Sequence, residues 1–449
     1  MSRLPLAALL LLALASAARG QEEALDLSFT GQLRVRGFHM ENTTRVNDLS
    51  TIDPTTRNNL FPNLNLNDSI DSNQTFLDTR LRLQFRLTAY QQVSAVLGIE
   101  VGDITFGVAS TGGGLGTDGR VFENKNLYLE WHPTEYSFKV RAGLYPRESD
   151  PLGLVLSNDV AGVHGEVELL GLDTTLYADA IMAVENSRLD LDGDGEIDND
   201  YNDRTLFLAG MRSTAAQVVD LEGIFIADID NTQDTPVANL ERDVYWGGAS
   251  ARAEAWILDA QAVFLYAYGH RRQPGSEITI RGYACDARVG LRLPFVYLQG
   301  IFAWASGRDP RRRSTDTAFP TITPFYAASG IIYNNFGGYS ATGSDLSGTA
   351  HTTLVVRGSP LDGLSLEAVL QWAWYTADRD VSNNQVRFNR DARDLGFEVD
   401  LNVDYTLVEG FKVYARGSLF FPGNGYLTTR DAPHKGSLAQ IILGAQLNF

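Results

Sequence analysis

The 449-residue sequence is poor in cysteine, in proline and in long apolar runs, and its basic residues are fewer than its acidic ones. The single cysteine, Cys285, cannot form an internal disulfide, which excludes a disulfide framework. The chain has 42 glycines but only 15 prolines, and it shows no proline-rich linker that would divide it into domains. The 37 Lys and Arg against 55 Asp and Glu give a net charge of −18. This balance excludes the basic surface that nucleic-acid binding requires.

The N-terminal apolar run, Leu4–Ala17, follows a short basic head and is shorter than a helix that spans a bilayer. Small residues allow cleavage after Ala17 or after Gly20, and no cysteine follows that would carry a lipoprotein anchor. We therefore predict a signal peptide over residues 1–20 and a single exported domain over residues 21–449. No later apolar run reaches the length of a spanning helix.

Apolar and polar residues alternate along much of the remaining chain. From Asp78 to Ala89 the even positions are polar or charged, and the odd positions are mostly Leu and Phe. A period of two is typical of a β-strand and not of a helix. The same pattern predicts strands at Phe29–Gly37, Val93–Val101, Phe138–Leu144, Ala249–Ala255, Ala287–Leu293, Leu364–Trp374, Leu395–Leu401 and Phe411–Leu419. In a soluble sandwich the apolar face would meet a second sheet, whereas in a single closed ring it would face lipid.

The connections between the predicted strands differ in length. Brief turns are predicted at Tyr90–Gln91, His132–Glu135, Gly171–Asp173, Leu258–Asp259, Pro294, Ser359–Gly363 and Val408–Gly410. Longer polar segments lie near residues 40–75, 105–122, 146–158, 185–203, 230–243, 270–277, 306–350, 378–392 and 421–436. Short periplasmic turns and long extracellular loops are typical of bacterial outer-membrane barrels. We therefore predict an all-β fold, a transmembrane antiparallel β-barrel of about 18 strands (16–18), with both termini in the periplasm.

The chain ends in a strand with one apolar face, Ala439–Phe449, which an aromatic residue closes. This ending resembles the terminal strand that marks bacterial outer-membrane β-barrels for assembly. The resemblance implies that Phe449 is a C-terminal assembly signal and that the barrel assembly machinery is a partner. Together with the signal peptide, it implies a location in the outer membrane of a Gram-negative cell, in contact with outer-membrane lipid and lipopolysaccharide.

The polar parity of the strands carries many charges, and a charged side chain that faced lipid at mid-membrane would cost about 2–4 kcal/mol. We therefore expect these side chains to face the interior. The basic ones are Arg34, Arg36, Arg80, Arg82 and Arg86 on the first two strands, then Lys139, Arg141, Arg288, Arg292, Arg357, Lys412 and Arg416. The acidic ones are Glu100, Glu130, Glu166, Glu168, Glu398, Asp400 and Asp404. Basic and acidic sectors would thus lie side by side on the wall.

Two interpretations of these charges stay open. In the first, the charges pair across neighbouring strands and hold the wall together. The predicted pairs are Lys139 and Arg141 with Glu166 or Glu168, and Arg416 with Glu398 or Asp400. In the second, the five arginines of the first two strands attract carboxylates, phosphates or sulfates. Few acids except Glu100 and Asp78 stand beside them, and a guanidinium group matches planar oxyanions.

Two predicted strands, Asn126–Trp131 and Phe138–Gly143, are joined by a turn and end in an Arg-x-Gly element, Arg141-Ala142-Gly143. In this element and in its general plan, the chain resembles porins of the alginate-export type and, more loosely, other substrate-specific porins of Gram-negative bacteria. The resemblance implies a channel for passive, anion-preferring diffusion of small anionic solutes or polysaccharides. The selecting residues that it implies are Arg34, Arg36, Arg80, Arg82, Arg86 and Arg141.

One predicted loop contains a pattern typical of calcium sites. Carboxylates stand at alternate positions, Gly195 occupies the sixth position, and Ile197 occupies the eighth. The predicted ligands are Asp190, Asp192, Asp194, Glu196 and Asp198. Tyr201 stands where the bidentate Glu would be, so Asp200 or Asp203 would have to replace it. A bound Ca²⁺ would hold this extracellular loop over the mouth of the barrel, and the alternative is an acidic, solvated loop.

Other function classes need features that the sequence lacks. None of the six histidines lies in a nucleophile or metal motif, so we expect no enzymatic activity. A gated transporter needs a plug domain before the barrel, but the strand pattern begins near Asp26. A fatty-acid channel needs an N-terminal hatch, which we do not find. A structural or adhesive barrel with a plugged lumen and a calcium-stabilised extracellular loop stays open as the alternative function.

Overall fold

The computed structural model describes most of the chain beyond the predicted signal peptide. The described residues are 25–41, 73–108, 111, 113, 122–133, 135–184, 203–215, 218–233, 240–273, 275–309, 311–312, 314–333, 335, 342, 344–377, 393–424, 426 and 437–449. No helix among these residues is long and apolar enough to cross a membrane. The predicted signal peptide lies outside them.

The regular elements of the described chain are strands. They are β1 (Leu25–Glu41), β2 (Gln74–Ala89), β3 (Val93–Thr105), β4 (Phe122–Trp131), β5 (Phe138–Glu148), β6 (Ser157–Leu169), β7 (Thr174–Val184), β8 (Arg204–Ala215), β9 (Val219–Gln233), β10 (Leu240–Ala255), β11 (Leu258–Gln273), β12 (Ser276–Arg292), β13 (Val296–Ala305), β14 (Thr315–Asp316), β15 (Thr349–Leu361), β16 (Leu364–Tyr375), β17 (Asp394–Val408), β18 (Phe411–Pro422) and β19 (Leu438–Asn448).

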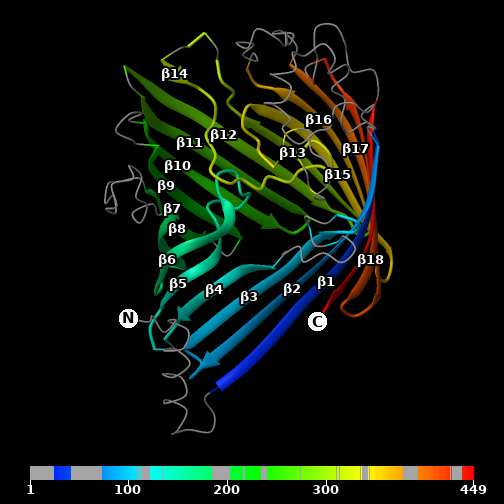
Figure 1. Cartoon of the computed structure of the whole chain (residues 1–449), viewed down its shortest axis with the longest axis horizontal. Helices are drawn as coiled ribbons and strands as arrows, with labels where there is room; N and C mark the ends of the chain where they lie inside the picture. The colour runs from blue at the N-terminus through cyan, green and yellow to red at the C-terminus, as the bar shows by residue number, and fades with distance from the viewer. Residues whose placement is uncertain are drawn as a thin grey trace.

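Eighteen of these strands form one closed antiparallel barrel, as predicted (Figure 1). Each strand pairs with its neighbours in the chain, and β1 closes the ring because it pairs with both β2 and β19. The short β14 stands apart from this ring order, since it pairs in parallel with β12. Closure leaves no free sheet edge, which is the condition for strands to cross a membrane.

The alternation of the sequence decides which face of each strand points outward. On β1, Leu27, Phe29 and Leu33 at odd positions are exposed, whereas Arg36 and Phe38 at even positions are buried. The same contrast recurs around the ring, for example on β12 with exposed Tyr283 and buried Ala284. An apolar outer face and a polar inner face are typical of a barrel in lipid.

The turns and loops match the sequence prediction except at four places. The predicted loop 230–243 is too long, because β9 runs to Gln233 and β10 begins at Leu240. The predicted turn Leu258–Asp259 is wrong, because both residues belong to β11 and the turn lies at residues 256–257. The predicted loop 146–158 is too long, because β5 continues to Glu148. The predicted loop 270–277 is wrong, because β11 runs to Gln273 and β12 begins at Ser276. The end of β11 has polar residues on both faces, His270, Arg271 and Arg272, so the alternation of apolar and polar residues stops there. These residues still pair with β12.

Two segments at the long-loop end fold into the barrel (Figure 1). They are residues 149–156, between β5 and β6, and the described residues of the range 306–348, between β13 and β15; we call them the inner loops. Leu156 pairs with Thr323, and the Ile322 amide donates to the Val155 carbonyl over 2.9 Å. Leu154, Ile332 and Tyr333 are buried in one hydrophobic core with side chains of the wall. The core of this barrel therefore lies inside the ring.

The turn of the first inner loop is built around Asp150. Its carboxylate accepts the amides of Leu152 and Leu154, each over 3.1 Å, and that of Val155 over 3.3 Å. Burial raises the pKa of Asp150, and these amide hydrogen bonds partly offset the increase. The carboxylate therefore supplies the acceptors that backbone amides need when a turn is buried.

Candidate functional site

The first candidate site is the arginine wall, which we define as Arg34, Arg36, Arg80, Arg82 and Arg86 on β1 and β2. All five lie on the parity opposite to the exposed apolar residues, at alternate positions of two neighbouring strands. Arg34 and Arg80 stand directly opposite each other in the ladder. Like charges at opposed positions repel, so this arrangement needs nearby acids or a bound anion.

Four of the five arginines have carboxylate partners. Arg36 binds buried Asp78 through two hydrogen bonds, and Arg34 lies 2.7 Å from Asp103. The other two pairs are Arg82 with Glu100, and Arg86 with Glu130 over 3.1 Å. Sequence analysis placed only Asp78 and Glu100 beside the cluster. It missed Asp103 because the ladder shifts register between Thr79 and Leu81.

Arg80 differs from its neighbours, because no carboxylate of the described residues forms an ion pair with it. Its Nε atom is buried and has no hydrogen-bond partner. Arg82 and Arg86 nearby keep 47% and 36% of their side chains exposed. The arginine wall therefore combines an unpaired guanidinium group with an interior surface that the inner loops leave open.

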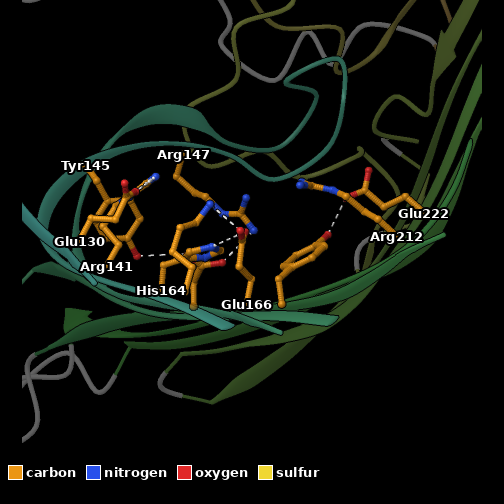
Figure 2. A network of polar contacts seen from close by, with 11 residues as sticks. Glu130, Arg141, Tyr145, Arg147, His164, Glu166, Arg212 and Glu222 are labelled. Atoms are coloured by element: carbon orange, nitrogen blue, oxygen red, sulfur yellow. Dashed lines mark hydrogen bonds and ion pairs between the residues drawn. The ribbon is translucent and has the colours of Figure 1, made fainter. Parts of the chain in front are cut away.

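A second polar cluster continues along the inner wall from β4 to β9 (Figure 2). Arg141 donates to Glu130 over 2.6 Å, so one carboxylate joins the cluster to Arg86 of the arginine wall. Lys139 pairs with Glu166, as predicted, but the predicted partner of Arg141 is wrong. Glu130 lies directly opposite Arg141 in the β4–β5 ladder and is therefore nearer than Glu168.

Buried Asp179 of β7 stands at the centre of this second cluster. It accepts from Tyr145 over 3.1 Å and lies 2.8 Å from Arg147 and 2.9 Å from His164. His164 also contacts Glu166 over 3.2 Å. Figure 2 shows Tyr145, Arg147, His164 and Glu166 of this cluster on the concave face of the sheet. Sequence analysis missed Arg147, which continues the alternation of β5, because residues from 146 onward were assigned to a loop.

The cluster ends at Glu222 of β9, which accepts from Tyr177 and from Arg212, each over 2.8 Å. Arg147 and Arg212 also lie over the Tyr177 ring, at 4.9 and 4.8 Å from its centroid. Arginines and acids thus alternate from β2 to β9. The continuous polar track can hold an anion at successive positions, because each guanidinium group has more donors than its carboxylate uses.

The remaining predicted basic residues all have acidic partners. Arg288 lies 2.8 Å from Asp286, Arg292 3.2 Å from Asp259, Lys412 3.7 Å from Asp404, and Arg416 2.7 Å from Asp404, while Arg357 pairs with Glu367. The prediction that Arg416 pairs with Glu398 or Asp400 is wrong. Those two carboxylates instead receive hydrogen bonds from an inner loop.

Glu398 and Asp400 of β17 hold the longer inner loop against the wall. Glu398 accepts the Ser329 hydroxyl over 2.8 Å and the Ile331 and Ile332 amides over 2.5 and 2.8 Å. Asp400 accepts the Gly330 amide over 3.0 Å. Four successive residues are therefore fixed by two carboxylates, and we call this contact the β17 latch.

Gly143, which follows the predicted Arg141-Ala142 pair, has a φ of 128°. A Cβ atom at this position would lie 2.3 Å from the carbonyl oxygen of Leu127 on β4. Only glycine fits, so this part of the Arg-x-Gly element has a backbone role, while Arg141 carries the charge.

The predicted calcium ligands Asp190, Asp192, Asp194, Glu196 and Asp198 lie outside the described residues. Within the described ranges, no group of three His, Cys, Asp or Glu residues is placed to hold a metal ion. Calcium binding by residues 190–198 stays a prediction, which calcium titration of the purified protein tests.

Comparison with known proteins adds information on the fold. No protein-family model matches the chain, and no curated protein sequence is similar to it. Several solved structures share its fold. Pseudomonas aeruginosa OccK8 (OprE) has 10% identity and a TM-score of 0.55 over 94% of this chain and 98% of its own.

Two other structures give the same result. Pseudomonas aeruginosa OpdQ has 10% identity and a TM-score of 0.54, covering 94% of this chain and 98% of its own. Acinetobacter baumannii OccAB3 has 9% identity and a TM-score of 0.53, covering 94% and 100%. These neighbours are outer-membrane porins, which are non-enzymatic channels. The chain thus shares the closed antiparallel β-barrel fold of these porins.

Proposed function

We propose that this protein is an outer-membrane channel for passive diffusion of small anionic solutes or anionic oligosaccharides, and that the arginine wall sets its preference for anions. The observation that carries the proposal is Arg80, a partly buried guanidinium group without a carboxylate partner in the described chain. A positive group in a narrow, low-dielectric passage attracts anions more strongly than the same group does in water.

The local charge balance supports this preference. The arginine wall together with Arg141 supplies six guanidinium groups, and their partners Asp78, Asp103, Glu100 and Glu130 supply four carboxylates. This sector therefore has a surplus of positive charge although the whole chain is negative. Anions that pass along it exchange water for guanidinium donors, and neighbouring donors on β4 to β9 allow them to leave again.

Conversion of Arg80, Arg82 and Arg86 to Gln tests the proposal. The triple variant loses three positive charges and keeps side chains that form hydrogen bonds. We expect the anion-to-cation permeability ratio, measured from reversal potentials across planar bilayers under a KCl gradient, to fall several-fold. An unchanged ratio in a variant that still conducts would refute the role of the arginine wall.

The alternative is a structural or adhesive barrel with a plugged lumen. One observation favours it: the inner loops share a buried core with the wall, including Tyr326, which hydrogen-bonds Asp286 over 2.6 Å. Single-channel conductance separates the two functions, because a plugged barrel does not conduct.

The finer resemblance to alginate-export porins stays a prediction, since none of the compared structures is an alginate-export porin. Comparing the permeation of alginate oligosaccharides with that of neutral oligosaccharides of equal length tests this resemblance.

A further inference from the structure

Three aromatic side chains form a shelf on the outer face of the barrel near its long-loop end. They are Tyr266 of β11, Tyr283 of β12 and Trp304 of β13. Tyr266 and Tyr283 are 44% and 45% exposed, so the shelf faces away from the interior core. The rings of Tyr283 and Trp304 stack with centroids 4.3 Å apart.

A recess of about 490 Å³ lies above this shelf, and four arginines line it. We call it the outer-face recess; its lining comprises the three aromatic residues, Arg281, Arg311, Arg312, Arg393, Asp309, Ser306, Gly307, Thr317, Thr376 and Ala377. The volume is in the range of sites that hold small molecules. The described lining thus contains four guanidinium groups and one carboxylate, that of Asp309.

The carboxylates near the recess are already engaged. Asp309 lies 3.3 Å from Arg312 and accepts the Arg311 amide over 3.0 Å. Asp394, next to Arg393 in the chain, accepts the indole N–H of Trp372 over 2.8 Å. Arg281 has no acidic partner among the described residues, and its guanidinium lies 5.7 Å from the centroid of the Tyr268 ring. Arg281 therefore gives the recess a positive charge that no described acid pairs with.

Hydrogen bonds of Thr317 and Thr376 fix the backbone beside the recess. The Thr317 hydroxyl donates to the Gly307 carbonyl and accepts the Asp309 amide, each over 2.8 Å. The Thr376 hydroxyl donates to the Ala305 carbonyl over 2.6 Å. These bonds connect the start of the β13–β15 segment to the end of β16, so the arginines stand on an ordered frame.

The position of the recess indicates what it meets in a membrane. On the same outer face, Phe264 of β11 and Phe302 of β13 lie farther from the long loops and are 51% and 43% exposed. Such apolar side chains face hydrocarbon, and Tyr and Trp are typical of the interface just above it. Arg281 is nearer than Tyr283 to the start of β12, and Arg311 and Arg312 follow the end of β13, so these arginines belong to the long-loop end, where we expect the phosphates of the outer leaflet.

We propose that the outer-face recess binds a phosphate group of a phosphorylated glycolipid of the outer leaflet, with the chemistry of lipid A. Guanidinium groups bind phosphate through paired hydrogen bonds. The aromatic shelf supplies the surface against which the lipid part packs, which a free phosphate ion would not use. This lipid site is independent of the interior charges and therefore of the proposed channel function.

Native mass spectrometry of the full-length mature protein in detergent tests the site. The probes are bisphosphorylated lipid A, lipid A from which both phosphates have been removed, and inorganic pyrophosphate. We expect bisphosphorylated lipid A to bind, and the variant Arg281→Gln/Arg312→Gln/Arg393→Gln to bind it at least tenfold more weakly. Dephosphorylated lipid A should bind the wild-type protein as weakly as the phosphorylated form binds the variant.

The matched control is Arg272→Gln, because Arg272 is an exposed arginine at the same rim that already lies 2.7 Å from Glu241. It should bind lipid A like the wild-type protein. Equal binding by the triple variant, or equal weakening by the control, would overturn the proposal. Pyrophosphate that binds as tightly as lipid A would also overturn it, as this would indicate a simple anion site. Single Arg281→Gln, with an expected several-fold loss, replaces the triple variant if the latter does not fold.

Discussion

At the residue scale, the arginines of the inner wall belong to two physical classes. Arg36 is 7% exposed and is held by Asp78, which is 3% exposed, so each charge depends on the other. Arg80 stands two strand positions from Asp78 and has no acid of its own in the described chain. The first class stabilises the wall. In the proposed channel, the second class attracts the anions that pass.

This distinction predicts opposite effects of two identical substitutions. Arg36→Gln leaves the buried carboxylate of Asp78 without a counter-charge, so the free energy of unfolding should fall by about 3–5 kcal/mol. Arg80→Gln breaks no ion pair and should change this free energy by less than about 1 kcal/mol. Guanidinium chloride unfolding of the barrel in lipid vesicles measures both.

The double variant Arg36→Gln/Asp78→Asn is the control for the stability effect. It removes both charges together, so most of the loss should be recovered. A double variant as unstable as Arg36→Gln would show that the arginine contributes through packing, for example against Phe38, whose ring centroid lies 4.7 Å from the guanidinium carbon.

The sequence could predict which way these side chains point but not all of their partners. Alternation places Arg34, Arg36 and Arg80 on the polar face of β1 and β2 without any tertiary information. The partner of Arg34 could not be predicted, because Asp103 comes into reach only through a local shift in register. The partner of Arg141 was likewise missed, because the register of β4 against β5 depends on the turn between them.

At the scale of elements, the inner loops decide how much of the lumen is open. The β17 latch fixes residues 329–332 through the carboxylates of Glu398 and Asp400. A hydrogen bond contributes about 0.5–1.5 kcal/mol to stability, so the four contacts together hold this loop against the wall. We therefore expect the latch to limit the free cross-section of the barrel.

Glu398→Gln combined with Asp400→Asn should release this loop. Each new side-chain amide has one acceptor oxygen and one NH₂ donor where the carboxylate had two acceptor oxygens. Some of the backbone amides of residues 330–332 therefore lose their acceptors. We expect single-channel conductance to rise or to fluctuate between levels, while the barrel itself stays folded. Recordings in planar bilayers at fixed salt measure this effect.

Asp404→Asn is the matched control for the latch, because Asp404 stands on the same strand and the same face but pairs with Arg416 and Lys412. It should leave the conductance steady. A double latch variant with the conductance trace of the wild-type protein would contradict the assigned role of Glu398 and Asp400.

The elements show which parts of a barrel the sequence determines locally. The period of two and the turn residues predicted the ring, because each strand requires one apolar and one polar face. The path of the inner loops was not predictable, since residues 149–156 and 306–348 meet each other and β17 across long distances in the sequence. The end of β11 was misassigned because polar residues in a ladder beyond the apolar band resemble a loop.

At the scale of the whole molecule, the ring is closed by the two ends of the described chain. Phe449 at the C-terminus exchanges two backbone hydrogen bonds with Gly31, of 2.6 and 3.0 Å, and its ring lies 5.6 Å from that of Phe29. These contacts join the last strand to the first. The role of Phe449 as an assembly signal stays a prediction, since it concerns the barrel before closure.

The whole barrel also separates two electrostatic surfaces. The arginine wall and the polar track of β4 to β9 face the interior, whereas the outer-face recess faces the lipid. Each can be altered without the other, so ion preference and lipid binding are expected to change independently. Arginines are thus concentrated at two defined sites, although the chain as a whole has a net negative charge.

The most direct test of the channel is the reversal potential of the purified mature protein in a planar bilayer that separates two KCl concentrations. The account predicts discrete conductance steps and a reversal potential whose sign indicates that chloride passes more readily than potassium. Absence of conductance, or a potential that indicates preference for potassium, would contradict it.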